Sequence, residues 1–313
     1  MKNVLITGVS GYIGSTLAGA LCADETIETV LGIDIRRPAA APEKIKFFEH
    51  DVRQPMTDLM TRHGVDTVVH AAYVLPPLHD TDLMESINVE GTRNVLESSA
   101  RAAVRRLLVT SSATAYGFHP DNPVPLTETD SLRGNKDFTY AKNKREIKAI
   151  IAPFAKRHPD IAVSVLGPCF VVGPTMDNPL SNHLKKCLVV LPKETSPLQL
   201  VHETDLMRAI LHCLKNDISG TFNIAGAGTI TVADMVRLMG NRPVWVPSRF
   251  LYPLNRIAWA LRLHFFTRFP SAALGLFRYL WVVSPKWFIE KTGFSYEFDS
   301  RTAFEDFARF AGR

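Results

Sequence analysis

Three side chains of this 313-residue sequence have the types and the order that proton transfer needs: Ser112, Tyr140 and Lys144. Tyr140 and Lys144 are four residues apart in a segment with a helical pattern, so they lie on one helical face. An isolated phenol has a pKa of about 10, and a neighbouring ammonium lowers that pKa toward neutrality. We therefore expect Tyr140 to act as a general acid or base and Ser112 to hydrogen-bond a substrate oxygen. Taken singly, they could be a surface tyrosine, a solvated lysine and a capping serine.

A glycine-rich turn stands near the beginning of the chain. An apolar run over residues 4–6 is typical of a strand buried on both faces, and a helical pattern follows it at once. The turn between them has the spacing G-x-x-G-x-x-G. Without Cβ atoms the backbone can approach a pyrophosphate, which then binds at the amino end of the helix. The turn predicts a dinucleotide site whose residues are Gly8, Gly11, Tyr12, Ile13 and Gly14.

An acidic residue after the second strand supports this interpretation. The strand over residues 29–33 ends in Asp34, twenty residues beyond Gly14, a spacing at which a carboxylate reaches the ribose hydroxyls of a dinucleotide. Arg36 and Arg37 raise the alternative of NADP, because an arginine there can bind the 2′-phosphate. Asp34 would repel that phosphate, so we predict NAD rather than NADP.

Strand and helix patterns alternate through the first half of the chain. This alternation predicts an α/β fold, a doubly wound parallel Rossmann sheet. Beyond residue 174 the alternation breaks down, so we divide the chain into an NAD-binding domain, 1–174, and a smaller C-terminal substrate-binding or cap subdomain, 175–313, with segments that return to the core. The expected strands are 45–48, 67–69, 106–110, 162–166, 199–201 and 221–225, and the expected helices are 83–102, 138–158 and 205–214.

Two further strand ends carry candidate cofactor contacts. Asp51 could accept a hydrogen bond from the adenine amino group, or it could cap the helix that follows, and Val52 beside it is a further candidate cofactor contact. Ala71 and Ala72 follow the fourth strand, where small side chains let a cofactor lie against the edge of the sheet. The loop that begins at Tyr73 is expected to border the substrate.

Taken together, the motifs resemble the extended short-chain dehydrogenases/reductases of the NAD-dependent epimerase/dehydratase family. The resemblance covers residues 1–225 and rests on the segments TGVSGYIG (7–14), HAA (70–72), NVEGT (88–92), SSATAYG (111–117), YAKNK (140–144) and VHETD (201–205), with Asp34 and Asp51-Val52. It implies that Tyr140 is the general acid/base, that Lys144 also binds the nicotinamide ribose, and that Ser112 orients the substrate. It adds Asn88 and Pro168 to the cofactor contacts, Ala113, Thr114 and Phe170 to the substrate contacts, and a homodimer.

The departures from the family pattern bear on the substrate. The usual L-R-P reads Leu166-Gly167-Pro168, Phe170 replaces an asparagine, and Leu198 replaces the arginine that binds a diphosphate. A diphosphate without that arginine loses a contact worth about 1.5–3 kcal/mol. Ala113-Thr114 also replaces the Asp-Glu pair of the dehydratases. We therefore expect neither dehydration nor a nucleotide sugar held by the standard diphosphate contacts.

The resulting hypothesis is an NAD-dependent oxidoreductase that transfers hydride to or from a secondary alcohol or ketone carbon of a small molecule. Two alternatives stay open. One is a nucleotide-sugar 4-epimerase that retains its NAD, and the other is a non-catalytic dinucleotide sensor. The intact set of Ser112, Tyr140 and Lys144 argues against the sensor, which needs no proton transfer.

The last third contains a long segment without acidic residues. Between Met235 and Ile289 there is no Asp or Glu, while eight arginines and lysines are spread through an apolar, aromatic sequence. We weigh three interpretations: a cap or oligomer face, which we favour; an apolar substrate pocket; and peripheral membrane contact by a basic amphipathic helix. The basic residues form no nucleic-acid motif.

Composition is that of an ordinary globular chain, with 46% hydrophobic residues, 21% charged residues and a net charge of +5. The strand at the N-terminus leaves no room for a signal peptide, and no apolar run is long enough to span a membrane. The four cysteines, Cys22, Cys169, Cys187 and Cys213, have no metal-site spacing, so we expect reduced core thiols, a cytoplasmic protein and no metal.

Overall fold

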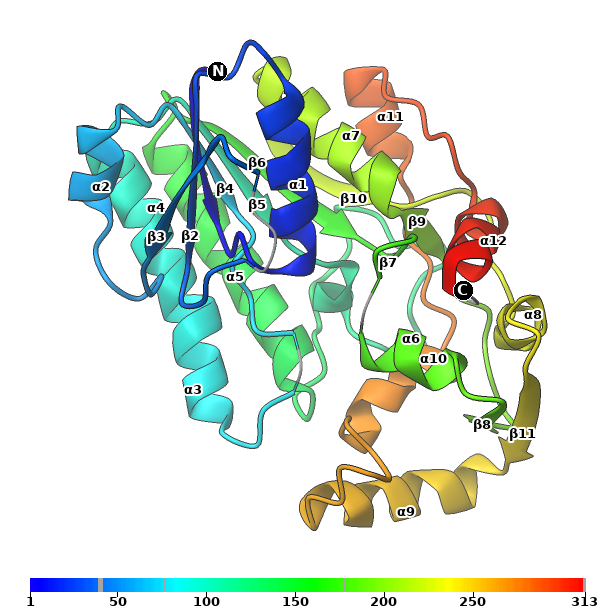
Figure 1. The fold of residues 1–313 in the computed structure, drawn as a ribbon. Helices are drawn as coiled ribbons and strands as arrows, with labels where there is room; N and C mark the ends of the chain where they lie inside the picture. The colour runs from blue at the N-terminus through cyan, green and yellow to red at the C-terminus, as the bar shows by residue number, and fades with distance from the viewer. Residues whose placement is uncertain (39–41, 76, 177, 312–313) are drawn as a thin grey trace. The chain divides into compact units, whose positions relative to one another are not determined.

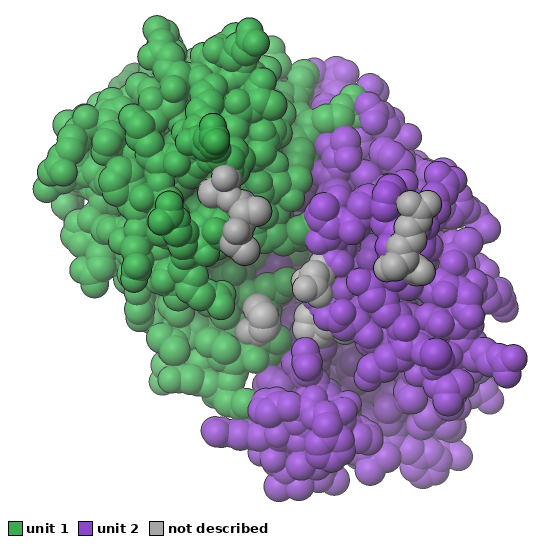
Figure 2. Space-filling model, viewed as in Figure 1, with its two compact units in different colours: residues 1–112, 143–167, 207–222 green, residues 113–142, 168–206, 223–313 purple. Residues whose placement is uncertain are grey.

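The chain divides into two compact units, which Figure 2 distinguishes by colour. The computed structural model describes residues 1–38, 42–75, 77–176 and 178–311. Unit 1 comprises residues 1–112, 143–167 and 207–222, and unit 2 comprises residues 113–142, 168–206 and 223–313. The functional division of the chain at residue 174 stays a prediction.

Unit 1 holds most of a seven-stranded sheet, with the strands in the spatial order β10-β6-β5-β4-β1-β2-β3 (Figure 1). The neighbouring pairs from β6 to β3 run parallel. The order 3-2-1-4-5-6 from one edge is that of a doubly wound dinucleotide-binding sheet, which confirms the predicted fold class. The strands are β1 (Asn3–Thr7), β2 (Thr29–Asp34), β3 (Ile45–Glu49), β4 (Thr67–His70), β5 (Arg106–Thr110), β6 (Ala162–Pro168) and β10 (Gly220–Ile224).

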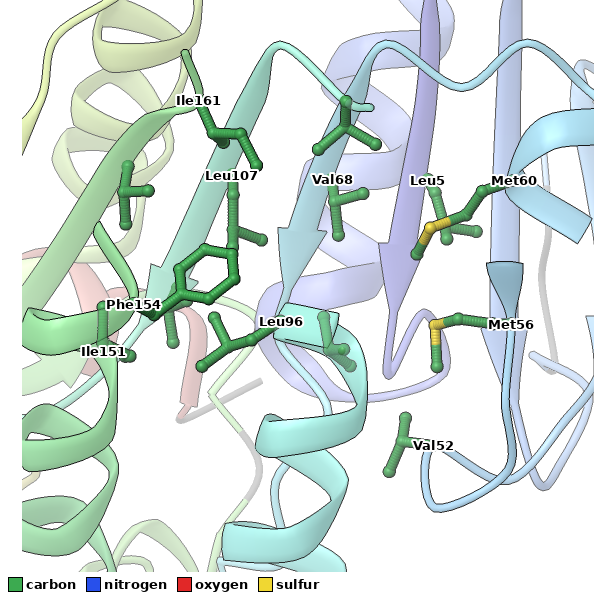
Figure 3. Close-up of a cluster of buried hydrophobic side chains, with 14 of the residues drawn as sticks. Leu5, Val52, Met56, Met60, Val68, Leu96, Leu107, Ile151, Phe154 and Ile161 are labelled. Carbon is green, nitrogen blue, oxygen red and sulfur yellow. The ribbon is translucent and has the colours of Figure 1, made fainter. Parts of the chain in front are cut away.

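Helices pack on both faces of this sheet, which explains the continuous apolar runs of its strands. Helix α1 (Tyr12–Ala23) lies against one face (Figure 1). On the other face, side chains of α2 (Thr57–Arg62), α4 (Gly91–Arg101) and α5 (Thr139–Arg157) meet those of the strands. Figure 3 shows Met60, Leu96 and Phe154 of these helices beside Leu5, Val68 and Leu107 of β1, β4 and β5.

The helix expected over residues 83–102 is interrupted. It begins as α3 (Thr81–Glu85), passes through a π-helical turn, η1 (Ser86–Glu90), and continues as α4. The π turn carries Asn88, which is fully buried. At the start of α4, a Cβ on Gly91 would lie 2.8 Å from Val52 Cγ2, so this glycine lets the helix pack against the segment that follows β3.

Unit 2 contains two small parallel sheets and most of the remaining helices. Strand β7 (Phe170–Val172) pairs with β9 (Leu200–His202), and β8 (Leu188–Pro192) pairs with β11 (Arg242–Val246). Helix α7 (Glu203–Lys215) begins in unit 2 and ends in unit 1. The other helices are η2 (Ala113–Tyr116), α6 (Pro179–Leu184), α8 (Val232–Leu238), α9 (Ser248–Ala260), η3 (Ser271–Leu274), α10 (Gly275–Arg278), α11 (Lys286–Thr292) and α12 (Ser300–Ala311).

Buried side chains join distant segments of unit 2 through backbone hydrogen bonds. The carboxylate of the fully buried Asp205 accepts from the N–H groups of Glu297 (3.0 Å) and Phe298 (3.0 Å). The amide of Gln199 accepts from Val283 N–H (2.9 Å) and donates to the Val283 carbonyl (3.1 Å). Each pairing satisfies polar groups that would otherwise be buried without partners.

The cysteines only partly match expectation. Cys169 and Cys213 are buried thiols as predicted, Cys22 is only partly buried, and Cys187 is exposed immediately before β8. The expectation of a core thiol was wrong there because Cys187 precedes a strand whose first residue, Leu188, is itself 60% exposed. Within the described ranges, no helix is both long enough and apolar enough to cross a membrane.

Candidate functional site

The glycine turn after β1 depends on two of its three glycines for different reasons. Gly8 adopts a φ of +71°, and a Cβ there would lie 2.5 Å from Ala72 Cα. Gly14 lies within α1, and a Cβ there would lie 2.1 Å from the Gly8 carbonyl oxygen. Gly8 therefore permits both the turn and its contact with the segment after β4. Gly14 lets the first turn of α1 pack directly against the backbone of Gly8.

The amino end of α1 has the character of an anion site. Gly11 is its N-cap residue, and across the described contacts no side chain caps it and no acidic residue occupies its first turn. The first N–H groups of a helix and its dipole attract a phosphate. Together with the backbone approach that Gly8 and Gly14 allow, this end of α1 fits the pyrophosphate of a dinucleotide.

Asp34 lies beside this turn. Its carboxylate accepts from the N–H groups of Ser10 (3.2 Å) and Arg36 (3.2 Å), and Ser10 Oγ donates to the Arg36 carbonyl (2.5 Å). These bonds tie the end of β2 to the glycine turn, and the ribose contact of Asp34 stays a prediction.

The structure separates the two interpretations of Asp51. Its carboxylate accepts from the N–H (2.9 Å) and the guanidinium (2.6 Å) of Arg53, which holds the pKa of Asp51 below its usual range. Met56 is the N-cap residue of α2, so the helix-cap interpretation was wrong. The adenine contact stays a prediction. Val52 points into the core, with 6% of its surface exposed.

A series of buried hydrogen bonds begins at the carboxyl ends of β1 and β4, beside the predicted cofactor residues Ala71 and Ala72. Thr92 Oγ1 donates to the Asn88 carbonyl (2.6 Å), so it must accept from His70 Nε2 (2.9 Å). His70 Nδ1 is then an acceptor for the Thr7 hydroxyl (2.7 Å), whose oxygen accepts from Ala72 N–H (3.2 Å). Burial lowers the pKa of His70 to about 3, with a further contribution from Lys144. His70 is therefore neutral and protonated on Nε2.

These hydrogen bonds hold the segment that follows β4 in place. Ala72 is held by its N–H to Thr7, and Val74 N–H donates to Asn88 Oδ1 (2.8 Å). The predicted cofactor residues Ala71 and Ala72 and the predicted substrate residue Tyr73 therefore lie on a segment bonded at both ends. Sequence reasoning missed the role of His70 because only the fold brings Thr7, His70 and Thr92 together.

Lys144 is the most constrained of the predicted catalytic residues. Its side chain is buried, its ammonium donates to the Thr110 carbonyl (3.1 Å), and Nζ lies 3.4 Å from the centre of the Tyr73 ring. Burial, together with the smaller effect of the charge of Lys148, lowers the pKa of Lys144 to about 7. The carbonyl and the ring favour the charged form and oppose this shift. Tyr73 thus contacts the predicted catalytic lysine, a position that the sequence did not indicate.

Lys148, one turn further along α5, is a second buried lysine that the sequence analysis missed. A Cβ on Gly167 would lie 3.3 Å from Lys148 Nζ. Gly167 is the position at which the sequence lacks the arginine of the family pattern. Because Gly167 has no side chain, the ammonium of Lys148 on α5 can lie close to its backbone.

The other predicted residues fall in both units. Ser112 is buried in unit 1, two residues beyond Thr110, whose carbonyl holds Lys144. Tyr140 is the second residue of α5, half-buried and 5.7 Å from the Phe138 ring, and one helical turn before Lys144. The remaining predicted contacts belong to unit 2: Ala113 and Thr114 in η2, Pro168 at the end of β6, and Phe170 in β7. Their roles stay predictions.

The fold and the glycine turn define a Rossmann-type dinucleotide-binding protein. The NAD dependent epimerase/dehydratase family model matches residues 4–225, and the chain belongs to this family. Because the family is NAD dependent, the match also confirms the predicted cofactor.

Three individual proteins that resemble this chain are each less than 30% identical to it. The uncharacterized protein Rv0501 of Mycobacterium tuberculosis is 29% identical over 324 residues, covering 99% of this chain and 84% of its own. An Escherichia coli O157:H7 protein, N-acetyl-alpha-D-glucosaminyl-diphospho-ditrans,octacis-undecaprenol 4-epimerase, is 26% identical over 70% of this chain and 65% of its own. The structure of the Thermotoga maritima UDP-glucose 4-epimerase with UDP-glucose superposes with a TM-score of 0.77 at 18% identity, covering 98% of each chain.

Proposed function

We propose that this protein is an NAD-dependent oxidoreductase that acts on a secondary alcohol or ketone carbon of a small molecule. The observation that carries the proposal is the buried Lys144 ammonium, held by the Thr110 carbonyl and the Tyr73 ring one helical turn after Tyr140. NAD, when bound, supplies the hydride acceptor. The glycine turn and Asp34 would hold it, and Lys144 would bond its ribose.

The residues of the chain handle the proton. As the substrate carbon loses hydride, its hydroxyl gives a proton to the Tyr140 phenolate, and the phenol returns that proton in the reverse direction. The Lys144 ammonium favours the phenolate electrostatically, so proton transfer can proceed near neutral pH. Ser112 would donate a hydrogen bond to the substrate oxygen and keep it aligned with Tyr140.

The substitution Tyr140→Phe tests this assignment, because it removes one oxygen and keeps the ring. Loss of general acid/base catalysis should lower turnover by about 10²–10⁴-fold, while NAD affinity changes little. NAD titration by protein fluorescence separates a lost proton transfer from a lost cofactor site. Turnover that survives unchanged in Tyr140→Phe would remove the mechanism.

A second candidate function is 4-epimerisation of a sugar diphosphate. It is favoured because the Escherichia coli relative and the Thermotoga maritima structural neighbour are both named as 4-epimerases. Leu198 weighs against the standard diphosphate contact, because it is buried and its backbone bonds with Ile230. Mass analysis of the cofactor released on denaturation distinguishes the candidates. An epimerase cycle never needs to release NAD(H), so retained cofactor and interconversion of UDP-hexoses would favour epimerisation. An empty site that then binds added NAD would favour the oxidoreductase.

A further inference from the structure

Helix α9 of unit 2 carries apolar side chains on its solvent side. Phe250, Leu254, Ile257 and Leu261 are spaced by four, three and four residues, which places them on one helical face, and between 53% and 65% of each is exposed. We call these four residues the α9 stripe. Beyond the end of the helix, Phe265 is 83% exposed.

The stripe is not the surface by which α9 packs on its own unit. The buried residues of the helix are Asn255 and Ala258, and Asn255 donates to the Phe269 carbonyl (3.0 Å). An ordinary surface helix turns its apolar face to the core and its polar face to solvent. Here a second apolar face is left for something outside the unit, and a contiguous exposed apolar surface marks an interaction site.

Positive charge predominates around the stripe. Arg249, Arg256, Arg262 and Arg268 are exposed along the same segment, which lies within the stretch from Met235 to Ile289 that has no acidic residue. The first turn of α9 does meet one acid, Glu194, but its carboxylate accepts from Ser248 N–H (3.0 Å) at the helix start. Within the described ranges none of these four arginines pairs with an acidic side chain, and the Arg249 guanidinium lies 4.9 Å from the centre of the Phe250 ring, so positive charge lies beside the apolar residues.

We propose that the α9 stripe docks this protein on an anionic lipid surface. Exposed phenylalanines and leucines beside arginines are the combination that lies in the headgroup region of a membrane, with the apolar side chains below the phosphates and the guanidinium groups among them. A second copy of the chain is a poorer occupant. A twofold interface through the stripe would bring the arginines of one copy against the same basic patch of the other, and the segment has no acid to pair with them.

For the α9 stripe this proposal adopts peripheral membrane contact, the third interpretation weighed from sequence, rather than the cap or oligomer face favoured there, and it does not depend on the proposed reaction. Sequence periodicity alone could not make the choice, because an apolar face every three to four residues is normally the core-facing one. The exposure of the stripe, with Asn255 and Ala258 buried instead, shows that this apolar face is not the core-facing one.

Co-sedimentation of the full chain with vesicles tests the proposal. Vesicles of phosphatidylcholine with phosphatidylglycerol should bind the protein, vesicles of phosphatidylcholine alone should not, and raising the salt should release it. Arg256→Gln/Arg262→Gln should weaken binding by about fivefold for each arginine, or about 25-fold. The matched control is Lys156→Gln/Arg157→Gln, which removes the same charge from exposed positions at the end of α5 and should leave binding unchanged.

The apolar contribution has its own pair of variants. Leu254→Ser/Leu261→Ser should weaken binding by at least about tenfold, since each leucine loses its burial in the membrane. Val124→Ser/Phe310→Ser removes two comparably exposed apolar side chains elsewhere, 53% and 49% exposed, and should bind like the wild type. All these side chains are exposed, so thermal unfolding should confirm that each variant folds.

Three results would overturn the proposal. The first is no binding of the wild type to the phosphatidylglycerol vesicles. The second is equal weakening by the α9 variants and their controls, which would make the attraction a matter of net charge. The third is a dimer in sedimentation velocity that Leu254→Ser/Leu261→Ser dissociates, which would assign the stripe to a second copy.

Discussion

Two glycines of α1 allow a matched test of the glycine turn. Gly14 and Gly19 both lie in this helix, so replacing either with alanine brings the same gain in helix propensity, up to about 1 kcal/mol. A Cβ on Gly19 would meet nothing within 4 Å, whereas a Cβ on Gly14 would lie 2.1 Å from the Gly8 carbonyl oxygen. Any difference between the two variants therefore reports the contact between the helix and the turn.

The magnitude follows from that distance. Ordinary contact with a Cβ begins at 3.4 Å, and the neighbours of Gly14 are backbone atoms, which cannot rotate away. Either α1 or the turn must move, and forced overpacking of this kind costs about 1–3 kcal/mol. The pyrophosphate would bind at that turn, so we expect the displacement to cost NAD binding a similar free energy. A loss of about 1–3 kcal/mol in binding corresponds to an affinity about 5- to 150-fold weaker in Gly14→Ala.

Calorimetric NAD titration and urea unfolding measure the two effects separately. Gly19→Ala should bind NAD like the wild type and unfold at higher urea, whereas Gly14→Ala should lose affinity and stability together. If Gly14→Ala bound NAD normally and gained as much stability as Gly19→Ala, the turn would not have the tight packing described, and the assignment of the pyrophosphate site would fail with it.

Two pH dependences follow from buried groups of unit 1. The folded pKa of His70 is about 3, below its ordinary value of 6.5, so between these values the unfolded chain binds the proton and stability falls as the pH falls. Urea unfolding from pH 7 to 4 should show a shallower loss in His70→Asn, and identical slopes would contradict the buried neutral imidazole. The folded pKa of Lys144 is about 7, below 10.5, so stability without NAD should rise with pH between these values. Lys144→Met should flatten that rise in urea unfolding, whereas the control Lys156→Met, at an exposed position, should keep it.

The sheet of unit 1 could be predicted from sequence because its strands are buried on both faces. The predicted run 106–110 coincides with β5, and each of those five residues is buried in the structure. The glycine turn was predicted for a related reason, since a local spacing suffices to specify it. These features depend on neighbours in the sequence, which the sequence displays directly.

The parts that escaped prediction depend on contacts across the chain or on unusual exposure. Strand β11 contains a proline and is mostly exposed, so it has neither alternation nor a buried run. Lys148 resembles any helical lysine until the fold sets it beside Gly167. Asp51 has the type of a helix-cap residue, but Arg53, two residues on, binds its carboxylate instead.

The hydrogen-bond chain through His70 has a direction, and that direction limits which side chains can replace its members. From Ala72 N–H to the Asn88 carbonyl, every group donates once toward the same end. Position 70 needs one acceptor facing Thr7 and one donor facing Thr92, which an amide can supply in one orientation and a carboxylate or an ammonium cannot. Thr7 and Thr92 can be exchanged for serine but not for valine. A protein designer who wished to alter the ends of β1 and β4 would therefore have to change Thr7, His70 and Thr92 together.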